Sequence, residues 1–162
     1  AKYGGSFLEF GYYSLLPIIK LFGVSYDSFQ IDSITGKGGI DLYTKVQIRY
    51  PDSMATAKMG VGVKSEGELV IAGTDGYILA QSPWWLTRHF EVRRENPTDI
   101  KVYEPGCQGD GLRYEISEFV AQINKNAKSG YKLTREEAIA MAVITEAFMK
   151  RRMEQNECRN TD

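Results

Sequence analysis

GGSFLEFGYYSLLPIIKLFG, residues 4–23, is a mostly apolar stretch of helical length that begins with two glycines and ends at a third. Gly23 is predicted to end the helix, because glycine is common just past a helix C-terminus. Pro17 has no N–H to give to the carbonyl four residues earlier. The helix is therefore expected to be kinked, or to begin again, near Pro17.

Two polar side chains stand out within this apolar stretch. Glu9 and Tyr13 are four residues apart, and that spacing puts both on one face of a helix, one turn apart. A carboxylate and a phenol beside a backbone irregularity form a candidate site. The alternative is that both are ordinary polar positions on a packed helix. Tyr12 points in another direction and is expected in the core.

A run of short strands is expected after this helix, at residues 25–35, 40–50, 55–63, 69–72, 77–80, 84–93 and 100–103. In residues 40–50 the polar set Asp41, Lys45, Gln47 and Arg49 alternates with an apolar set, which is typical of an antiparallel sheet with one wet face. Gly60 and Gly62 indicate close packing or a bend in the third strand.

Helices return in the last third of the chain. Apolar residues recur at helical spacing over residues 112–123, and Thr134 to Glu137 form a capping box before a helix at 138–152. The polar residues 154–162 are expected to fray. The predicted fold is α+β, a largely antiparallel, open-faced sheet of about seven strands with helices packed on one face. Residues 1–162 are expected to form a single domain.

Composition narrows the class of protein. The 162 residues are 43% hydrophobic and 25% charged, with a net charge of −1, which is typical of a globular protein. A net charge this close to zero does not indicate nucleic acid or an anionic membrane as a binding partner. Cys107 and Cys158 form no metal-type cluster and no disulfide framework. No apolar run has the length of a membrane span, and no signal peptide is visible. A reducing, cytoplasmic compartment is expected.

The glycine motif of the opening stretch resembles a known pattern. Gly4-Gly5-x-x-Leu8-Glu9-x-Gly11-x-Tyr13 is similar to the Gly-Gly-x-x-Leu-Asp-x-Gly-x-His/Tyr motif of the glucose–fructose oxidoreductase, inositol dehydrogenase and rhizopine-catabolism family. The resemblance continues in order through residues 21–23, 73–76 and 111–119 and through the capped last helix. It therefore covers nearly the whole chain.

This resemblance implies the C-terminal α/β domain of such an oxidoreductase. In the family an N-terminal dinucleotide-binding domain comes first, and that domain is expected to be missing from this chain, whose first residue, Ala1, is not a methionine. The implied chemistry is hydride transfer between NAD or NADP and a carbon of a sugar or polyol. The implied partners are the substrate and further copies of the chain, joined through the open sheet face. This chain alone is expected to be inactive.

The resemblance also implies site residues. Tyr13 is similar in position to the general acid/base, and Glu9 to an acidic residue that contacts a substrate hydroxyl. Arg113 and Tyr114 follow a loop that lies near the family's pocket. Apart from the resemblance, Trp84 and Trp85 are candidates to stack on a sugar ring. Two departures matter, because the family usually has Asp at the position of Glu9 and often has His at the position of Tyr13.

Phenols titrate near pH ~10, so a phenol that takes an alcohol proton at neutral pH needs a cation close by. The family supplies a lysine from a Glu-Lys-Pro motif in its other domain, and this sequence contains no such tripeptide.

Other interpretations of the residues stay open. Arg113 and Tyr114 also fit a solvated helix start, and Trp84 also fits strand packing. The glycine-rich loop before Leu112 has no βαβ context and is not read as a phosphate fingerprint. One alternative function is a non-enzymatic ligand-binding or dimerisation module on the same fold. Another is a sugar-binding protein without redox chemistry that uses Trp84 and Trp85. His89 is expected at the surface.

Overall fold

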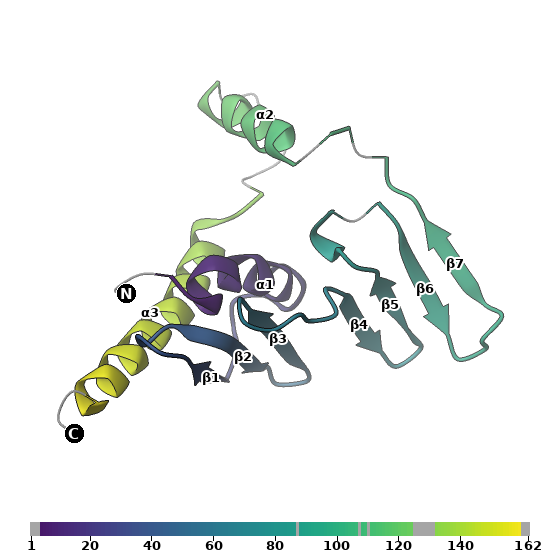
Figure 1. Ribbon diagram of the computed structural model, residues 1–162. Coiled ribbons are helices and arrows are strands. Elements are labelled where there is room, and N and C mark those ends of the chain that lie inside the picture. The colour runs from purple at the N-terminus through teal and green to yellow at the C-terminus, as the bar shows by residue number, and fades with distance from the viewer. Residues whose placement is uncertain (1–3, 87, 107, 110, 125–131, 160–162) are drawn as a thin grey trace. The chain divides into compact units, whose positions relative to one another are not determined.

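The computed structural model describes residues 4–86, 88–106, 108–109, 111–124 and 132–159. Figure 1 shows the elements in chain order, which are α1 (Ser6–Phe22), β1 (Ser28–Thr35), β2 (Asp41–Arg49), β3 (Met54–Gly60), β4 (Leu69–Gly73), β5 (Gly76–Ala80), the 3₁₀ turn η1 (Trp84–Leu86), β6 (Phe90–Arg94), β7 (Ile100–Tyr103), α2 (Leu112–Ile123) and α3 (Arg135–Arg159). Contacts divide the chain into two compact units. The first comprises residues 1–65 and 132–162, and the second comprises residues 66–131.

The first unit contains the core. Its antiparallel sheet has the order β1-β2-β3, and Val46 lies between Ile31 on one neighbouring strand and Ala57 on the other. These three buried residues therefore lie on one face of the sheet. The cluster around them also draws on both helices and comprises Phe7, Leu15, Ile18, Ile19, Ile31, Val46, Ile48, Tyr50, Ala57, Met59, Ala140, Met141, Ile144 and Phe148.

The second unit is a four-stranded antiparallel sheet, β4-β5-β6-β7, together with η1 and α2. Ala80 is a buried side chain in this sheet. α2 has the apolar spacing predicted for it, but no residue of α2 is buried. Of the helices that the structure describes, none combines the length and apolar character needed to cross a membrane.

The sheet prediction is confirmed in strand number and direction, but the prediction of one continuous sheet is wrong. The described strands form one sheet of three and another of four. β3 ends at Gly60, and Gly62 then donates its N–H to the carbonyl of Leu42 at 3.0 Å. A Cβ at Gly62 would lie 3.0 Å from the Cβ of Leu42, so the close packing expected from the glycines is present. Whether helices cover one face of all seven strands stays a prediction.

The predicted strand over residues 84–93 is only partly correct. Trp84–Leu86 is a 3₁₀ turn, and β6 begins at Phe90. The Leu86 N–H donates to the Pro83 carbonyl at 2.9 Å, and the Trp84 N–H donates to the Gly67 carbonyl at 3.0 Å. The Leu86 bond is local, because proline readily starts a turn of this kind. The Trp84 bond reaches back to the segment before β4.

Helix ends follow the sequence in most places. Gly23 ends α1 with φ 83°, and its N–H donates to the Ile19 carbonyl. α1 passes through Pro17 without interruption, so the prediction that a new helix begins there is wrong. α3 continues to Arg159 rather than fraying from Glu154, and Glu154, Gln155, Glu157 and Arg159 of this segment are good helix formers.

The capping box of α3 is confirmed. The Thr134 N–H donates to Glu137 Oε2 at 2.7 Å, and the Glu137 N–H donates to Thr134 Oγ1 at 3.2 Å. Glu137 also pairs with Lys20 of α1 at 2.8 Å, which joins the two helices. The Lys20 ammonium, followed by the Thr134 N–H, lowers the pKa of Glu137 below its usual value of 4.5.

Replacing Glu137 by Gln should therefore lower the melting temperature in a pH-dependent way. A carboxylate whose pKa is lowered by folding stabilises the folded state above pH ~4.5, and that contribution is lost as the pH falls through the folded-state pKa. The expected difference from wild type is small, because the ion pair is partly exposed. It should be present at pH ~7 and vanish in acid. Glu136→Gln, at an exposed position on the same turn, is the control; a difference that grew in acid would contradict the assignment.

Candidate functional site

Glu9 and Tyr13 lie on the exposed side of α1. The helix buries Phe7, Leu15 and Ile19 against the core, whereas Glu9 is exposed and Tyr13 is 62% exposed. Within the described part of the chain, neither the Glu9 carboxylate nor the Tyr13 hydroxyl has a hydrogen-bond partner. Both groups are thus available to a ligand from the same helix face. The prediction of Tyr12 in the core is wrong, because its side chain is 50% exposed and packs edge-on to the Tyr13 ring.

The start of α1 is held by a residue that the sequence did not single out. Gly5, the residue before the helix, makes no side-chain cap. Instead, Asp41 of β2 accepts the Phe7 N–H at Oδ2, at 2.7 Å. Thr44 donates its hydroxyl to the same oxygen at 2.7 Å, and Ser6 donates its hydroxyl to the Asp41 carbonyl at 2.9 Å. A side chain from the sheet therefore does the work of an N-cap.

The placement of Asp41 corrects the strand pattern. Alternation puts Asp41 on the wet face of β2, but the residue is 2% exposed. The register runs from Ile34 opposite Tyr43 to Thr35 opposite Asp41, so Leu42 is skipped. Such a bulge moves every residue beyond it to the other face. Leu42 accordingly is 39% exposed.

Gly5 explains part of the opening glycine motif. Its φ of +108° favours glycine, and a Cβ built there would lie 2.0 Å from Asp41 Oδ1. This oxygen is buried and has no hydrogen-bond partner among the described residues. The position of Asp41 therefore requires a residue without a Cβ at position 5. The glycine at the helix start was the signal in the sequence for a side chain packed closely against it.

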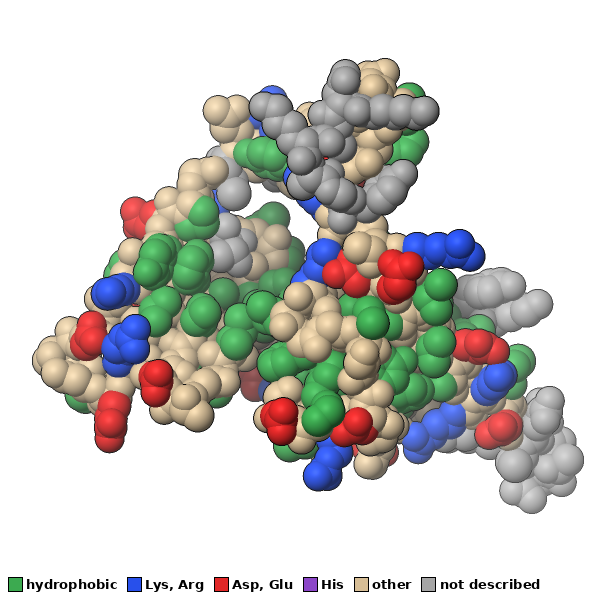
Figure 2. All heavy atoms as spheres, turned by 180° about the vertical axis from the view of Figure 1, so that it is seen from behind, with side chains coloured by type: hydrophobic (Ala, Val, Ile, Leu, Met, Phe, Trp, Pro, Cys, Tyr) green, Lys and Arg blue, Asp and Glu red, His purple; other side chains and the backbone are tan. Residues whose placement is uncertain are grey.

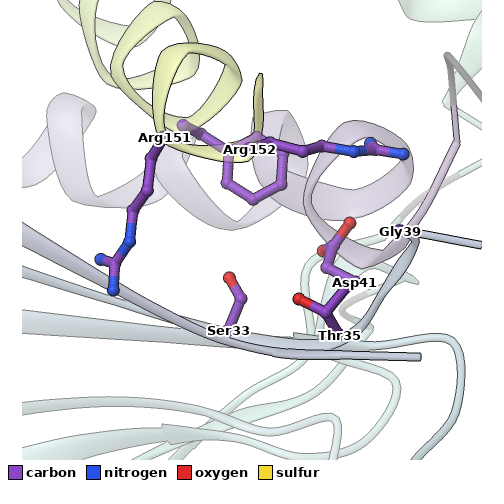
Figure 3. A pocket seen from close by; sticks show the side chains of 7 residues that line it. Ser33, Thr35, Gly39, Asp41, Arg151 and Arg152 are labelled. Carbon is purple, nitrogen blue, oxygen red and sulfur yellow. The ribbon is translucent and has the colours of Figure 1, made fainter. Parts of the chain in front are cut away.

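A small pocket opens beside Asp41 in the first unit. It is lined by Ser33, Thr35, Gly39, Asp41, Phe148, Arg151 and Arg152. Figure 3 shows Ser33 and Asp41 pointing from the sheet toward the helix that carries the two arginines. Arg152 is 8% exposed and donates to the Gly4 carbonyl at 2.8 Å, and Arg151 donates to the Ile31 carbonyl. Both arginines thus bond to backbone carbonyls. None of the predicted site residues lines the pocket.

The other predicted substrate contacts lie in the second unit. Tyr114 accepts the Gln108 N–H at its hydroxyl, at 2.7 Å, and Arg113 donates to Gln108 Oε1 at 3.2 Å. These bonds close the glycine-rich loop onto the start of α2. Trp84 begins η1, and its ring packs edge-on to Trp85. The predicted site residues therefore fall into two sets, one in each unit, and the substrate roles of Trp84, Arg113 and Tyr114 stay predictions.

An ion-pair row follows one face of β6. His89 Nε2 lies 3.2 Å from Glu91 Oε1, and Glu91 Oε2 lies 2.6 Å from Arg93. The hydrogen bond from Arg93, followed by that from His89, lowers the pKa of Glu91. His89 is partly exposed, close to the surface position expected for it. Among the described residues, no group of three or more His, Cys, Asp or Glu side chains is arranged to hold a metal ion.

Solved oxidoreductases share this fold. An aldose-aldose oxidoreductase from Caulobacter crescentus, complexed with glycerol, is 15% identical with a TM-score of 0.72, over 94% of this chain and 46% of that one. A UDP-N-acetylglucosamine 3-dehydrogenase from Acidithiobacillus ferrooxidans is 15% identical with a TM-score of 0.62, over 83% of this chain and 45% of that one. No family model and no curated protein matches the sequence.

The chain thus spans about half the length of the solved structures that it matches. At this level of identity the likeness shows the fold, and the fold is one found in oxidoreductases. The resemblance drawn from the glycine motif is confirmed to that extent.

Every described strand pair in both sheets is antiparallel, so these pairs do not form the parallel βαβ unit whose first turn cradles a dinucleotide in doubly wound folds. What this chain offers chemically is a carboxylate and a phenol on one exposed helix face.

Gly5→Ala should destabilise the protein more than Gly4→Ala. Both glycines have positive φ, so both variants carry backbone strain, but a Cβ at Gly4 meets nothing within 4 Å. The added clash with Asp41 is expected to cost a further ~1–3 kcal/mol in the free energy of unfolding. Urea denaturation of the two variants measures it, and equal losses would show that Asp41 moves aside freely.

Proposed function

We propose that this chain is the substrate-binding part of an NAD- or NADP-dependent oxidoreductase that acts on a sugar or polyol. One observation carries the proposal. α1 presents Glu9 and Tyr13 of the glycine motif together on its exposed side, in a fold shared with sugar oxidoreductases.

Tyr13 is proposed as the general acid/base. Oxidising a carbinol to a carbonyl removes one hydride from carbon and one proton from oxygen. This chain would supply the acceptor for the proton, as a Tyr13 phenolate that becomes the phenol. In the reverse direction the phenol returns the proton to the carbonyl oxygen. A phenolate near neutral pH requires a nearby cation, which is proposed to come from outside this chain.

Glu9 is proposed to orient the substrate. Its carboxylate lies one helical turn before Tyr13 and is suited to accept a hydrogen bond from a neighbouring sugar hydroxyl. In the second unit, taken by itself, Trp84, Arg113 and Tyr114 are proposed as sugar contacts, by ring stacking and by hydrogen bonds to hydroxyls. The dinucleotide is proposed to bind a preceding domain, as the family resemblance implies.

A homo-oligomer through the open sheet face is proposed as well. The register of the four-stranded sheet puts Val70, Tyr77, Ile100 and Val102 on one face, each at least 38% exposed. On the face of the molecule seen in Figure 2, hydrophobic side chains are exposed among acidic and basic side chains. Glu91 and Arg93 lie on the same face, between β5 and β7. Exposed apolar side chains around a charged pair favour contact with a second copy.

Tyr13→Phe in the full-length oxidoreductase should reduce kcat by ~10²–10⁴-fold, the usual loss when a general acid/base is removed. The assay follows NAD or NADP reduction by aldoses and UDP-N-acetylglucosamine. Tyr12→Phe, at the exposed neighbour, is the matched control and should retain the rate. Full activity of Tyr13→Phe would favour the non-enzymatic binding module. Turnover by residues 1–162 alone would contradict the assignment of the dinucleotide to another domain.

Val70→Lys combined with Val102→Lys should dissociate the proposed oligomer, because it places two charges on the face to be buried. Sedimentation or light scattering of the full-length protein measures the change in mass. Val63→Lys is the control, since Val63 is 48% exposed and lies outside both sheets. An unchanged mass in the double variant would exclude this face as the interface.

A further inference from the structure

We propose that Asp41 is a positioning residue for the reaction, which sets the place of α1 and thereby of Glu9 and Tyr13. The inference rests on the proposed function. It concerns a side chain of β2 that lies outside the glycine motif and outside the predicted site.

The bonds of Asp41 reach the helix turn that leads to the site. Its Oδ2 accepts the Phe7 N–H, two residues before Glu9. Ser6 donates to the Asp41 carbonyl and accepts the Val61 N–H at 3.0 Å. The first turn of α1 is thus joined to β2 and to the segment after β3. A helix held at its start by buried bonds has little freedom to slide or turn, so Tyr13, two turns along, is held with it.

The rotamer of Asp41 is itself fixed. Thr44 donates its hydroxyl to Asp41 Oδ2, and Thr44 is in turn 2.9 Å from the Ser33 hydroxyl. Asp41 is 2% exposed and Thr44 is fully buried. A row of three side chains on β1 and β2 therefore supports the contact with Phe7.

The second oxygen of Asp41 makes no such bond, and this has a cost. Asp41 Oδ1 is buried without a partner in the described structure and is pressed against Gly5. Leaving a buried carboxylate oxygen unsatisfied costs stability, and such groups in native structures call for an explanation. We explain the unsatisfied Oδ1 by the position that the carboxylate must take for Oδ2 to hold the start of α1.

The test is a double-mutant cycle in the full-length oxidoreductase, with NAD or NADP and the most active of the aldoses. Asp41→Ala should lower kcat by roughly 10- to 100-fold, because a misplacement of about 1 Å costs on that order, with KM changed by less than about threefold. Asp41→Asn should restore most of the rate, since its carbonyl oxygen can accept both bonds. Asp52→Ala, at an exposed turn, is the control.

The decisive measurement is Asp41→Ala in the Tyr13→Phe background. If Asp41 acts by placing Tyr13, the double variant loses little beyond Tyr13→Phe alone. Equal losses in both backgrounds, or an unchanged kcat for Asp41→Ala, would overturn the positioning role and leave the proposed function intact. Full activity of Tyr13→Phe would overturn both.

If Asp41→Ala does not fold, Thr44→Val is the second variant that tests the inference. It removes one of the two bonds to Oδ2 at nearly unchanged volume. It should give a smaller loss of kcat, about threefold to tenfold, with the same dependence on Tyr13. A loss that is independent of Tyr13 would again overturn the inference.

Discussion

The hydrogen bond from the Phe7 N–H to Asp41 is the contact on which the first unit depends. It joins the start of α1 to the middle strand of the sheet. With that end fixed, Leu15, Ile18 and Ile19 fall onto the buried face of β2 and β3, and the opposite side of the helix faces outward. Glu9 and Tyr13 are exposed because the core side of α1 is already determined.

Local patterns in the sequence predicted much of this. The helical spacing of residues 4–23, the hairpin glycines and the capping box each depend on neighbours within a few residues, and those elements form as expected. Glu9 and Tyr13 share a helix face for the same reason. The role of Asp41 could not be predicted, because it follows from a bulge at Leu42 and a bond across 34 residues.

The division into two sheets and the 3₁₀ turn were missed for a related reason. Alternation in the third strand continues past Gly60, but the Gly62 N–H bonds to Leu42 instead of extending a ladder. Residues 84–93 were predicted to form one strand, yet the Pro83 and Gly67 carbonyls accept the N–H groups of Leu86 and Trp84. Leu42 and Gly67 lie outside the window in which periodicity is read, whereas Pro83 is a local acceptor that starts a turn.

The exposure of the candidate site bears on what the chain needs around it. Proton transfer from an alcohol is efficient where water is excluded and a cation is fixed beside the base, whereas Tyr13 is 62% exposed. The core contacts of α1 leave its outer face free to be covered, and the chain spans about half of the oxidoreductases that share its fold. The chemistry proposed for Tyr13 therefore requires that the exposed side of α1 be covered. In that proposal the sheet and Asp41 fix the place of Tyr13, and the cation comes from outside this chain.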